Sequence, residues 1–170
     1  MPSHALRKRD AVKPGHLLVA LLLAGCGAAE TDSAPGVRFD PTSLLPGDRV
    51  GDLIADSLSI RQTSGSDWVG MAHFRGELML GGHASHPPEA ATSAVCFEAD
   101  SISAARMPRW AGDRRRPVVC FTNPAQAARE LGPAVEARPA TIVIDGFSVQ
   151  RGQFDGLNRA RFVRLLARDG

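Results

Sequence analysis

Two matching tripeptides constrain the fold of this 170-residue chain more than any other feature. Val95-Cys96-Phe97 recurs as Val119-Cys120-Phe121. In a β-strand alternate residues share a face, so each cysteine points away from the valine and the phenylalanine beside it. Two strands with this pattern can pair and bring both thiols to one side. The pattern therefore predicts strands over residues 94–99 and 117–122, with the two cysteines on a shared face.

A short apolar run lies near the N-terminus, over residues 17–24. It follows a basic stretch that contains Arg7, Lys8, Arg9 and Lys13. As a helix the run is only about 12–15 Å long, half the hydrocarbon core of a bilayer, so it is too short to span a membrane. Its length and the preceding positive charge are typical of a secretory signal peptide over residues 1–25.

The apolar run ends in Leu23-Ala24-Gly25-Cys26, and here the sequence resembles the bacterial lipoproteins that are cut by the lipoprotein signal peptidase. The motif of that family is leucine, two small residues and cysteine, and all four positions match. The resemblance implies cleavage after Gly25, a diacylglyceryl group on the Cys26 sulfur and acylation of the new amino terminus. Two or more acyl chains anchor a protein stably to a membrane. The alternative is an ordinary secretory signal with a chance cysteine.

The same resemblance implies a location. Residue 27 is Gly rather than Asp, which in Gram-negative lipoproteins favours the outer membrane, facing the periplasm. Cys96 and Cys120 then form an even pair in an oxidising compartment, which favours a disulfide. In the chain-entropy model a closed loop of about 25 residues contributes roughly 3 kcal/mol. Two buried free thiols, or a redox or metal role, are the alternatives.

Removal of the signal peptide would change the charge balance. Residues 1–25 contain four basic side chains and one acidic one, so their loss changes the formal net charge from +2 to −1. A nucleic-acid-binding domain is expected to be basic and to offer stacking side chains, whereas aromatic residues make up 5% of this chain. We therefore expect no nucleic-acid partner.

The remaining chain divides into a tether and one folded domain. Residues 26–47 are small and polar without sustained periodicity, which predicts a flexible tether, and residues 48–170 form the globular domain. Strands are expected over residues 50–60, 67–74, 77–84 and 141–145, in addition to the two cysteine strands. Arg75-Gly76 is a hairpin turn or a bulge. Residues 160–166 form a last strand or a terminal helix.

One short helix is expected over residues 125–131. Asn123 can cap it, Pro124 suits the first helical position, and Gln126 completes the spacing of a capping box. Gly132 and the following proline end it.

Several short strands, one short helix and Gly-rich turns predict a mainly β fold, either a small β-barrel or a sandwich. The order of elements is also loosely similar to small oligonucleotide/oligosaccharide-binding (OB-like) barrels. This similarity rests on the Gly-bounded segment at residues 76–82 and on a short helix before a Thr-Ile-Val-Ile strand. This similarity implies no functional residue.

An arginine-rich segment between the two cysteine strands is the candidate binding loop. Arginine forks bind phosphate or carboxylate groups at two points, and a tryptophan offers a flat apolar face. In a cell envelope such a loop fits an anionic headgroup, a glycan carboxylate or an acidic protein surface. The alternative is a solvated connection. The candidate residues are Arg106, Arg109, Trp110, Arg114, Arg115 and Arg116.

Three histidines provide a weaker candidate. His83 and His86 lie in Gly81-Gly82-His83-Ala84-Ser85-His86, and His73 lies ten residues before His83. Imidazoles on a loop can bind zinc or copper. Residues three apart in a strand face opposite ways, so the loop would have to bend to bring the two rings together. Solvated loop histidines are the alternative, and we expect no bound metal or other cofactor beyond the lipid on Cys26.

The sequence contains no catalytic motif: Gly-x-Ser-x-Gly, His-Glu-x-x-His and a phosphate-cradling glycine loop are all missing. The expected function is therefore that of a lipid-anchored envelope lipoprotein, a non-catalytic binding or scaffolding module that meets the membrane through its lipid and binds a protein or an anionic envelope partner. A periplasmic metal-binding lipoprotein using His83 and His86 is the alternative, and a small envelope enzyme is the third.

Overall fold

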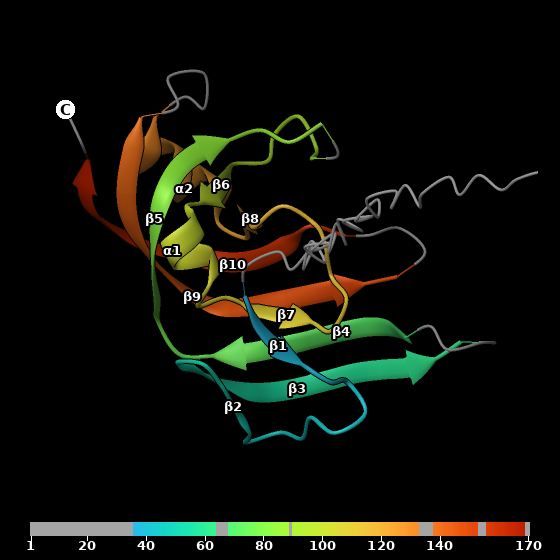
Figure 1. The fold of residues 1–170 in the computed structure, drawn as a ribbon. Helices are drawn as coiled ribbons and strands as arrows, with labels where there is room; N and C mark the ends of the chain where they lie inside the picture. Colours follow the sequence, from blue (N-terminus) through green and yellow to red (C-terminus); the bar gives the residue numbers. More distant parts are fainter. Residues whose placement is uncertain (1–35, 64–67, 89, 133–137, 153–155, 169–170) are drawn as a thin grey trace, which may run out of the picture. The chain divides into compact units, whose positions relative to one another are not determined.

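The computed structural model describes residues 36–63, 68–88, 90–132, 138–152 and 156–168. The expected signal peptide, Cys26 and the tether up to residue 35 lie outside the described residues. The described part is mainly β, as predicted. In chain order its elements are β1 (Val37–Phe39), β2 (Arg49–Val50), β3 (Leu53–Gln62), β4 (Trp68–Arg75), β5 (Leu78–Ser85), β6 (Cys96–Ala99), α1 (Ser101–Ala104), β7 (Pro108–Trp110), β8 (Val118–Phe121), α2 (Pro124–Leu131), β9 (Pro139–Arg151) and β10 (Asn158–Arg168) (Figure 1).

Five strands close into a ring. β5 pairs with β6, β6 with β8, β10 with β9, and β9 with β5, all antiparallel, while β8 and β10 pair in parallel and complete the circle. We call these five strands the ring. Its interior is filled by apolar side chains that are fully or almost fully buried. They include Leu80, Phe97, Val119, Phe121, Ile142, Ile144, Ala160 and Phe162.

Two long strands run out of the ring. β4 and β5 both pair antiparallel with β9, so they act as one strand interrupted at Gly76. Figure 1 shows the chain turning there. The interruption is a bulge rather than a hairpin turn, which decides between the two predicted alternatives. Gly76 (φ 116°) and Gly146 (φ 62°) occupy it, with positive φ values that strain residues carrying a Cβ.

An open layer continues from this bulge. β3 pairs with β4, and β2 pairs with β3, so β2, β3, β4 and the second half of β9 form a sheet that does not close. β1 and β7 make a separate two-stranded parallel sheet. An aromatic cluster connects the two sheets, because the Phe39 ring lies 5.5 Å from that of Phe74 and 5.2 Å from that of Trp110.

The cysteine strands are confirmed as β6 and β8. Cys96 lies directly opposite Cys120 in the antiparallel pair, and the two are joined by a disulfide. Alternation explains the repeated tripeptide: Phe97, Val119 and Phe121 fill the ring interior, while the disulfide lies on the other face and packs against Val118.

The boundary between tether and domain was predicted too late. Residues 37–39 form β1, and Phe39 and Leu44 are 6% and 8% exposed in the core. This stretch has no strand-like periodicity, because three residues of one strand and an irregular turn are too short to show one. The folded domain therefore includes residues 36–47, which were expected to belong to the tether.

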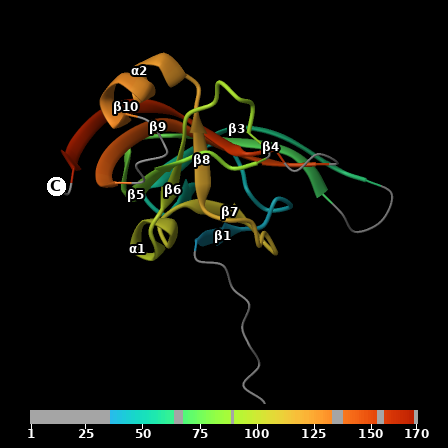
Figure 2. The same cartoon turned by 90° about the horizontal axis from the view of Figure 1, so that it is seen from above.

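Helix α2 confirms the predicted helix, although not its expected cap. Asn123 makes no capping hydrogen bond. Its amide instead bonds the backbone N–H and C=O of Phe162 on β10, at 2.8 Å each, and Figures 1 and 2 show α2 beside that strand. A second helix, α1, was missed: its single turn, capped by Asp100, is too short to produce a helical pattern.

Other expected elements agree with the structure. Residues 158–168 form a strand, β10, rather than a terminal helix, and the strand expected at residues 141–145 is the middle of the longer β9. Within the described residues no helix has both the length and the apolar character needed to cross a bilayer.

Candidate functional site

Only part of the arginine-rich segment, residues 106–116, is exposed at the surface. Its centre forms β7, where Arg109 is 4% exposed and Trp110 is fully buried. Trp110 packs on Phe39 inside the aromatic cluster, so it cannot serve as a flat platform for a ligand. The prediction of one continuous binding loop was wrong for these two residues, because pairing between β1 and β7 draws them into the core.

One carboxylate holds the centre of the segment together. Asp113 is 9% exposed, and its two oxygens accept hydrogen bonds from Nε and Nη2 of Arg115 at 2.9 and 2.8 Å. The guanidinium of Arg109 lies 3.7 Å from Asp113 and donates to the backbone carbonyl of Arg115. Two arginines are thus organised around one buried acid.

The ionisation of this cluster follows from its contacts. Burial alone would raise the pKa of Asp113, but hydrogen bonds from Arg115 and the charges of Arg115 and Arg109 outweigh it, and the pKa of Asp113 is lowered. Burial lowers the pKa of Arg109, a change that Asp113 opposes. Because an arginine pKa lies far above neutrality, the cluster is ionised at pH 7 with two cations and one anion.

A hollow of about 390 Å³ opens beside this cluster. It is lined by Gly112, Asp113, Arg114, Arg115 and Arg151. We call it the arginine hollow. Arg114 is exposed, and Arg151, at the end of β9, donates to the carbonyl of Ala111 at 3.2 Å. Among the described residues of the lining the one acid is Asp113, whose oxygens both bond Arg115, so the described part of the lining carries a net positive charge.

Residues far apart in the sequence build this hollow. Nη1 of Arg115 donates to the carbonyl of Gly156 at 2.6 Å, which connects the segment to the loop between β9 and β10. Arg151 and Gly156 were not among the predicted site residues. Nothing in their local sequence marks them, because only the path of β9 brings them next to residues 112–115.

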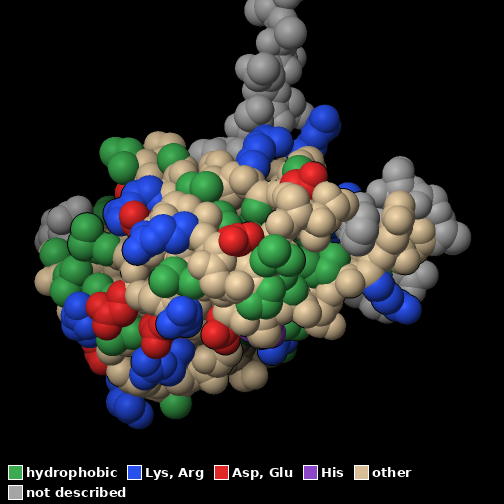
Figure 3. Space-filling view, turned by 90° about the horizontal axis from the view of Figure 1, so that it is seen from below, with side chains coloured by type: hydrophobic (Ala, Val, Ile, Leu, Met, Phe, Trp, Pro, Cys, Tyr) green, Lys and Arg blue, Asp and Glu red, His purple; other side chains and the backbone are tan. Residues whose placement is uncertain are grey.

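The two ends of the predicted loop make other contacts. Nε of Arg106 donates to Asp52 at 3.1 Å, and Arg116 pairs with Glu98 on β6. Figure 3 likewise shows arginines interspersed with acidic side chains on the face that it draws, rather than one basic field. The candidate site is therefore narrower than the predicted loop and consists of Arg114, Arg115 and Arg151.

The histidines are placed separately. His83 lies on β5, and its Nε2 is 3.8 Å from a carboxylate oxygen of Glu98. His86 follows the end of β5, and its Nδ1 is 3.3 Å from the carbonyl oxygen of Ala94. His73 is exposed on β4. In the part of the chain that the structure describes, no three His, Cys, Asp or Glu side chains form a group that could hold a metal ion. The metal-binding alternative stays a prediction.

Comparison with known proteins adds no relative: the chain matches no family model, no curated protein and no solved structure.

Proposed function

We propose that this chain is a lipid-anchored envelope protein whose β domain binds an anionic group of a partner in the arginine hollow. The observation that carries the proposal is the composition of that hollow, in which, among the described residues, three arginines meet one carboxylate already bonded within the cluster. Arginine guanidinium groups fit phosphate and carboxylate at two points.

The anchor rests on the motif at residues 23–26. Ten residues separate Cys26 from Val37, the first residue of β1. A chain of that length spans at most roughly 33–36 Å, so lipid on Cys26 would keep the domain close to the membrane. β1 pairs with β7, the strand that precedes the arginine hollow in the chain. The first strand after the proposed anchor is thus paired with the strand that precedes the arginine hollow in the chain.

We also propose that the ring is an OB-like barrel, which would make binding rather than catalysis its ordinary use. Support comes from a five-stranded closed pairing order with one parallel pair, and from the position of α2 between β8 and β9. OB-folds are five-stranded Greek-key barrels that bind oligonucleotides and oligosaccharides. The arginine hollow lies beside the ring and offers charge rather than stacking surfaces.

Two measurements test the proposal. Denaturing intact mass of the full-length protein extracted from its own membrane should show loss of residues 1–25 and an acyl adduct on Cys26, and Cys26→Ala should abolish both. An unlipidated, unprocessed wild-type chain would overturn the anchor.

For the hollow, isothermal titration of the extracted protein in detergent with inorganic phosphate and with citrate, at constant ionic strength, gives a Kd for each anion. We expect the double variant R114E/R151E to weaken binding at least tenfold. The matched control R61E/R129E changes net charge equally at two exposed arginines elsewhere. Equal losses in both variants, or no binding to the wild type, would overturn the hollow as the site.

A further inference from the structure

The charge at the arginine hollow limits which anions can be neutralised there. Arg115 and Arg151 line it together with one carboxylate, Asp113. Arg109, buried 3.7 Å from Asp113, adds a third cation to the same cluster. Even without the exposed Arg114, three cations and one anion give these described side chains a net charge of +2. A ligand with a single negative charge neutralises only half of it.

Hydrogen-bond donors remain on both Arg115 and Arg151. An arginine side chain has five N–H donors. Arg115 uses three of them, two toward Asp113 and one toward the carbonyl of Gly156, whereas Arg151 uses one, toward the carbonyl of Ala111. Counting bonds between described residues, Arg115 thus keeps two donors and Arg151 keeps four. A ligand with several acceptor oxygens can therefore bind both side chains at once.

Arg115 is held in place by the protein itself. Its backbone N–H donates to Asp113 at 3.0 Å, its backbone carbonyl accepts from Arg109, and its guanidinium connects Asp113 with Gly156. A side chain that is already ordered loses little conformational entropy when a ligand binds. The positive charge of Arg115 is therefore fixed at the hollow before binding.

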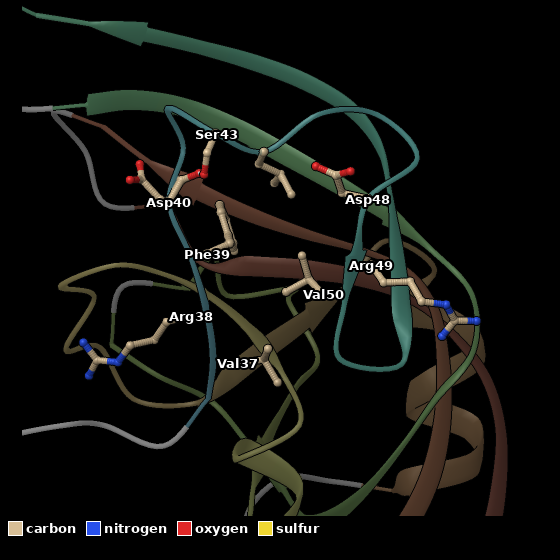
Figure 4. Close-up of a pocket in the computed structure, with 9 residues that line it drawn as sticks. Val37, Arg38, Phe39, Asp40, Ser43, Asp48, Arg49 and Val50 are labelled. Atoms are coloured by element: carbon tan, nitrogen blue, oxygen red, sulfur yellow. The ribbon is translucent and has the colours of Figure 1, made fainter.

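The rest of the fold makes this charge specific to the arginine hollow. A second hollow of about 360 Å³, between β1 and β2 (Figure 4), is lined by Arg38 and Arg49 together with Asp40 and Asp48. The charges of its described side chains cancel, so an anion gains nothing there. Trp110 is fully buried, so it offers a base or a sugar ring no stacking surface beside the arginine hollow. Recognition there depends on the charged group of the ligand.

We propose that the arginine hollow binds the terminal phosphate of a phosphate monoester in preference to a phosphodiester or a carboxylate. This inference rests on the proposed function and narrows it. A monoester phosphate carries a charge of about −1.5 to −2 at pH 7 and three acceptor oxygens, which fit the net charge of +2 and the remaining donors of two arginines. A phosphodiester or a carboxylate carries one charge. Lipid headgroups and soluble esters both offer a monoester phosphate.

The first test compares two esters by isothermal titration of the extracted full-length protein in detergent, at constant ionic strength and about pH 7.5. We expect glycerol 3-phosphate, a monoester, to bind roughly tenfold more tightly than dimethyl phosphate, a diester, because it carries nearly twice the charge. Equal Kd values for the two esters would overturn this inference and leave anion binding in the hollow standing. No binding of any anion would overturn the proposed function itself.

Acidification separates the charge of the ligand from that of the protein. The second pKa of a phosphate monoester is about 6, so lowering the pH from about 7.5 to about 5.5 should weaken glycerol 3-phosphate roughly three- to fourfold. Sulfate stays a dianion and should bind equally at both values. The protein charge is constant in this range, because the pKa of Asp113 is lowered by Arg115 and Arg109, which stay protonated. Equal losses for the two ligands, or none for the monoester, would contradict the proposal.

A matched pair of variants locates the effect. Arg151→Gln removes one charge and its donors from the hollow and should weaken glycerol 3-phosphate at least tenfold, whereas Arg129→Gln, at an exposed arginine on α2, should not. Equal effects of the two variants would overturn the assignment.

Dihexanoyl phosphatidic acid, a lipid that ends in a monoester phosphate, identifies the source of the ligand. Tighter binding of this lipid than of glycerol 3-phosphate would support a headgroup, and equal or weaker binding would support a soluble ester.

Discussion

The ring and the open layer differ in how they leave the hydrogen-bonding edges of their strands. In the ring every strand has a neighbour on both sides, and a disulfide joins two of them. Among the described strands, the open layer ends at the two-residue β2, and β1 pairs with β7 alone. The arginine hollow lies at the far end of β9, beyond the residues of β9 that pair with the other ring strands. Closure uses up hydrogen-bonding edges, so the candidate site lies where closure stops.

We expect the largest loss of stability from a substitution of Asp113, because this residue supports the small β1–β7 sheet. Asp113→Asn removes the buried carboxylate that lies 3.7 Å from Arg109 and bonds Arg115, and removing one partner of a buried ion pair typically costs about 3–5 kcal/mol. Urea unfolding of the full-length protein measures the loss. A change below about 1 kcal/mol would show that Arg109 finds other partners and that this cluster is not what holds the sheet.

The same variant has a pH signature with a definite sign. Because the pKa of Asp113 is lowered below its ordinary value of 3.8, its contribution is complete above that value and is lost as pH falls through the lowered pKa. Wild type should therefore lose stability in acid faster than Asp113→Asn does. Parallel acid curves for the two proteins would contradict this assignment.

The disulfide tests the ring itself. Replacing both cysteines, as C96A/C120A, should cost about 3 kcal/mol, because the bond closes a loop with a sequence separation of 24 residues. Thermal unfolding should show the loss, while phosphate binding in the arginine hollow should be unaffected at a temperature where the variant is folded. Loss of phosphate binding in folded protein would mean that the arginine hollow depends on the disulfide of the ring.

Gly146 tests the bulge where ring and layer meet. Gly146→Ala places a Cβ at φ 62°, which should cost roughly 1–2 kcal/mol. The control Gly152→Ala has no close neighbour and no positive φ, so its effect in the same urea titration should be smaller. A larger cost for the control would mean that the bulge does not require glycine.

The smallest effect is expected at the surface of the ring. Arg164 pairs with Glu77 at 3.1 Å, and both side chains are about half exposed. Solvent screens such pairs, so Arg164→Ala should cost about 0.2–1 kcal/mol. High salt should remove the difference from wild type in a thermal melt. A loss above 2 kcal/mol would show that the pair contributes to ring closure.

Sequence reasoning succeeded where the pattern was local and long. The repeated Val-Cys-Phe tripeptide predicted the pairing of β6 and β8, and Pro124 with Gly132 predicted α2, because these signals lie within the elements themselves. It failed where tertiary pairing decides. Nothing near residue 38 indicates that β1 will find β7, and that pairing is what buries Arg109 and Trp110.

The candidate site shows the same division. Arg114 and Arg115 stand out in the sequence because they are clustered, whereas Arg151 becomes part of the hollow only through the course of β9. Phe39 lies in a stretch whose composition is typical of a tether, and its burial depends on contacts with β7 and β4.

The long strands have a consequence for how the domain melts. β9 and the joined β4–β5 segment belong to both ring and open layer, so neither part can lose its strands while the other keeps all of its own. Unfolding should be cooperative, with one calorimetric transition and equal van't Hoff and calorimetric enthalpies.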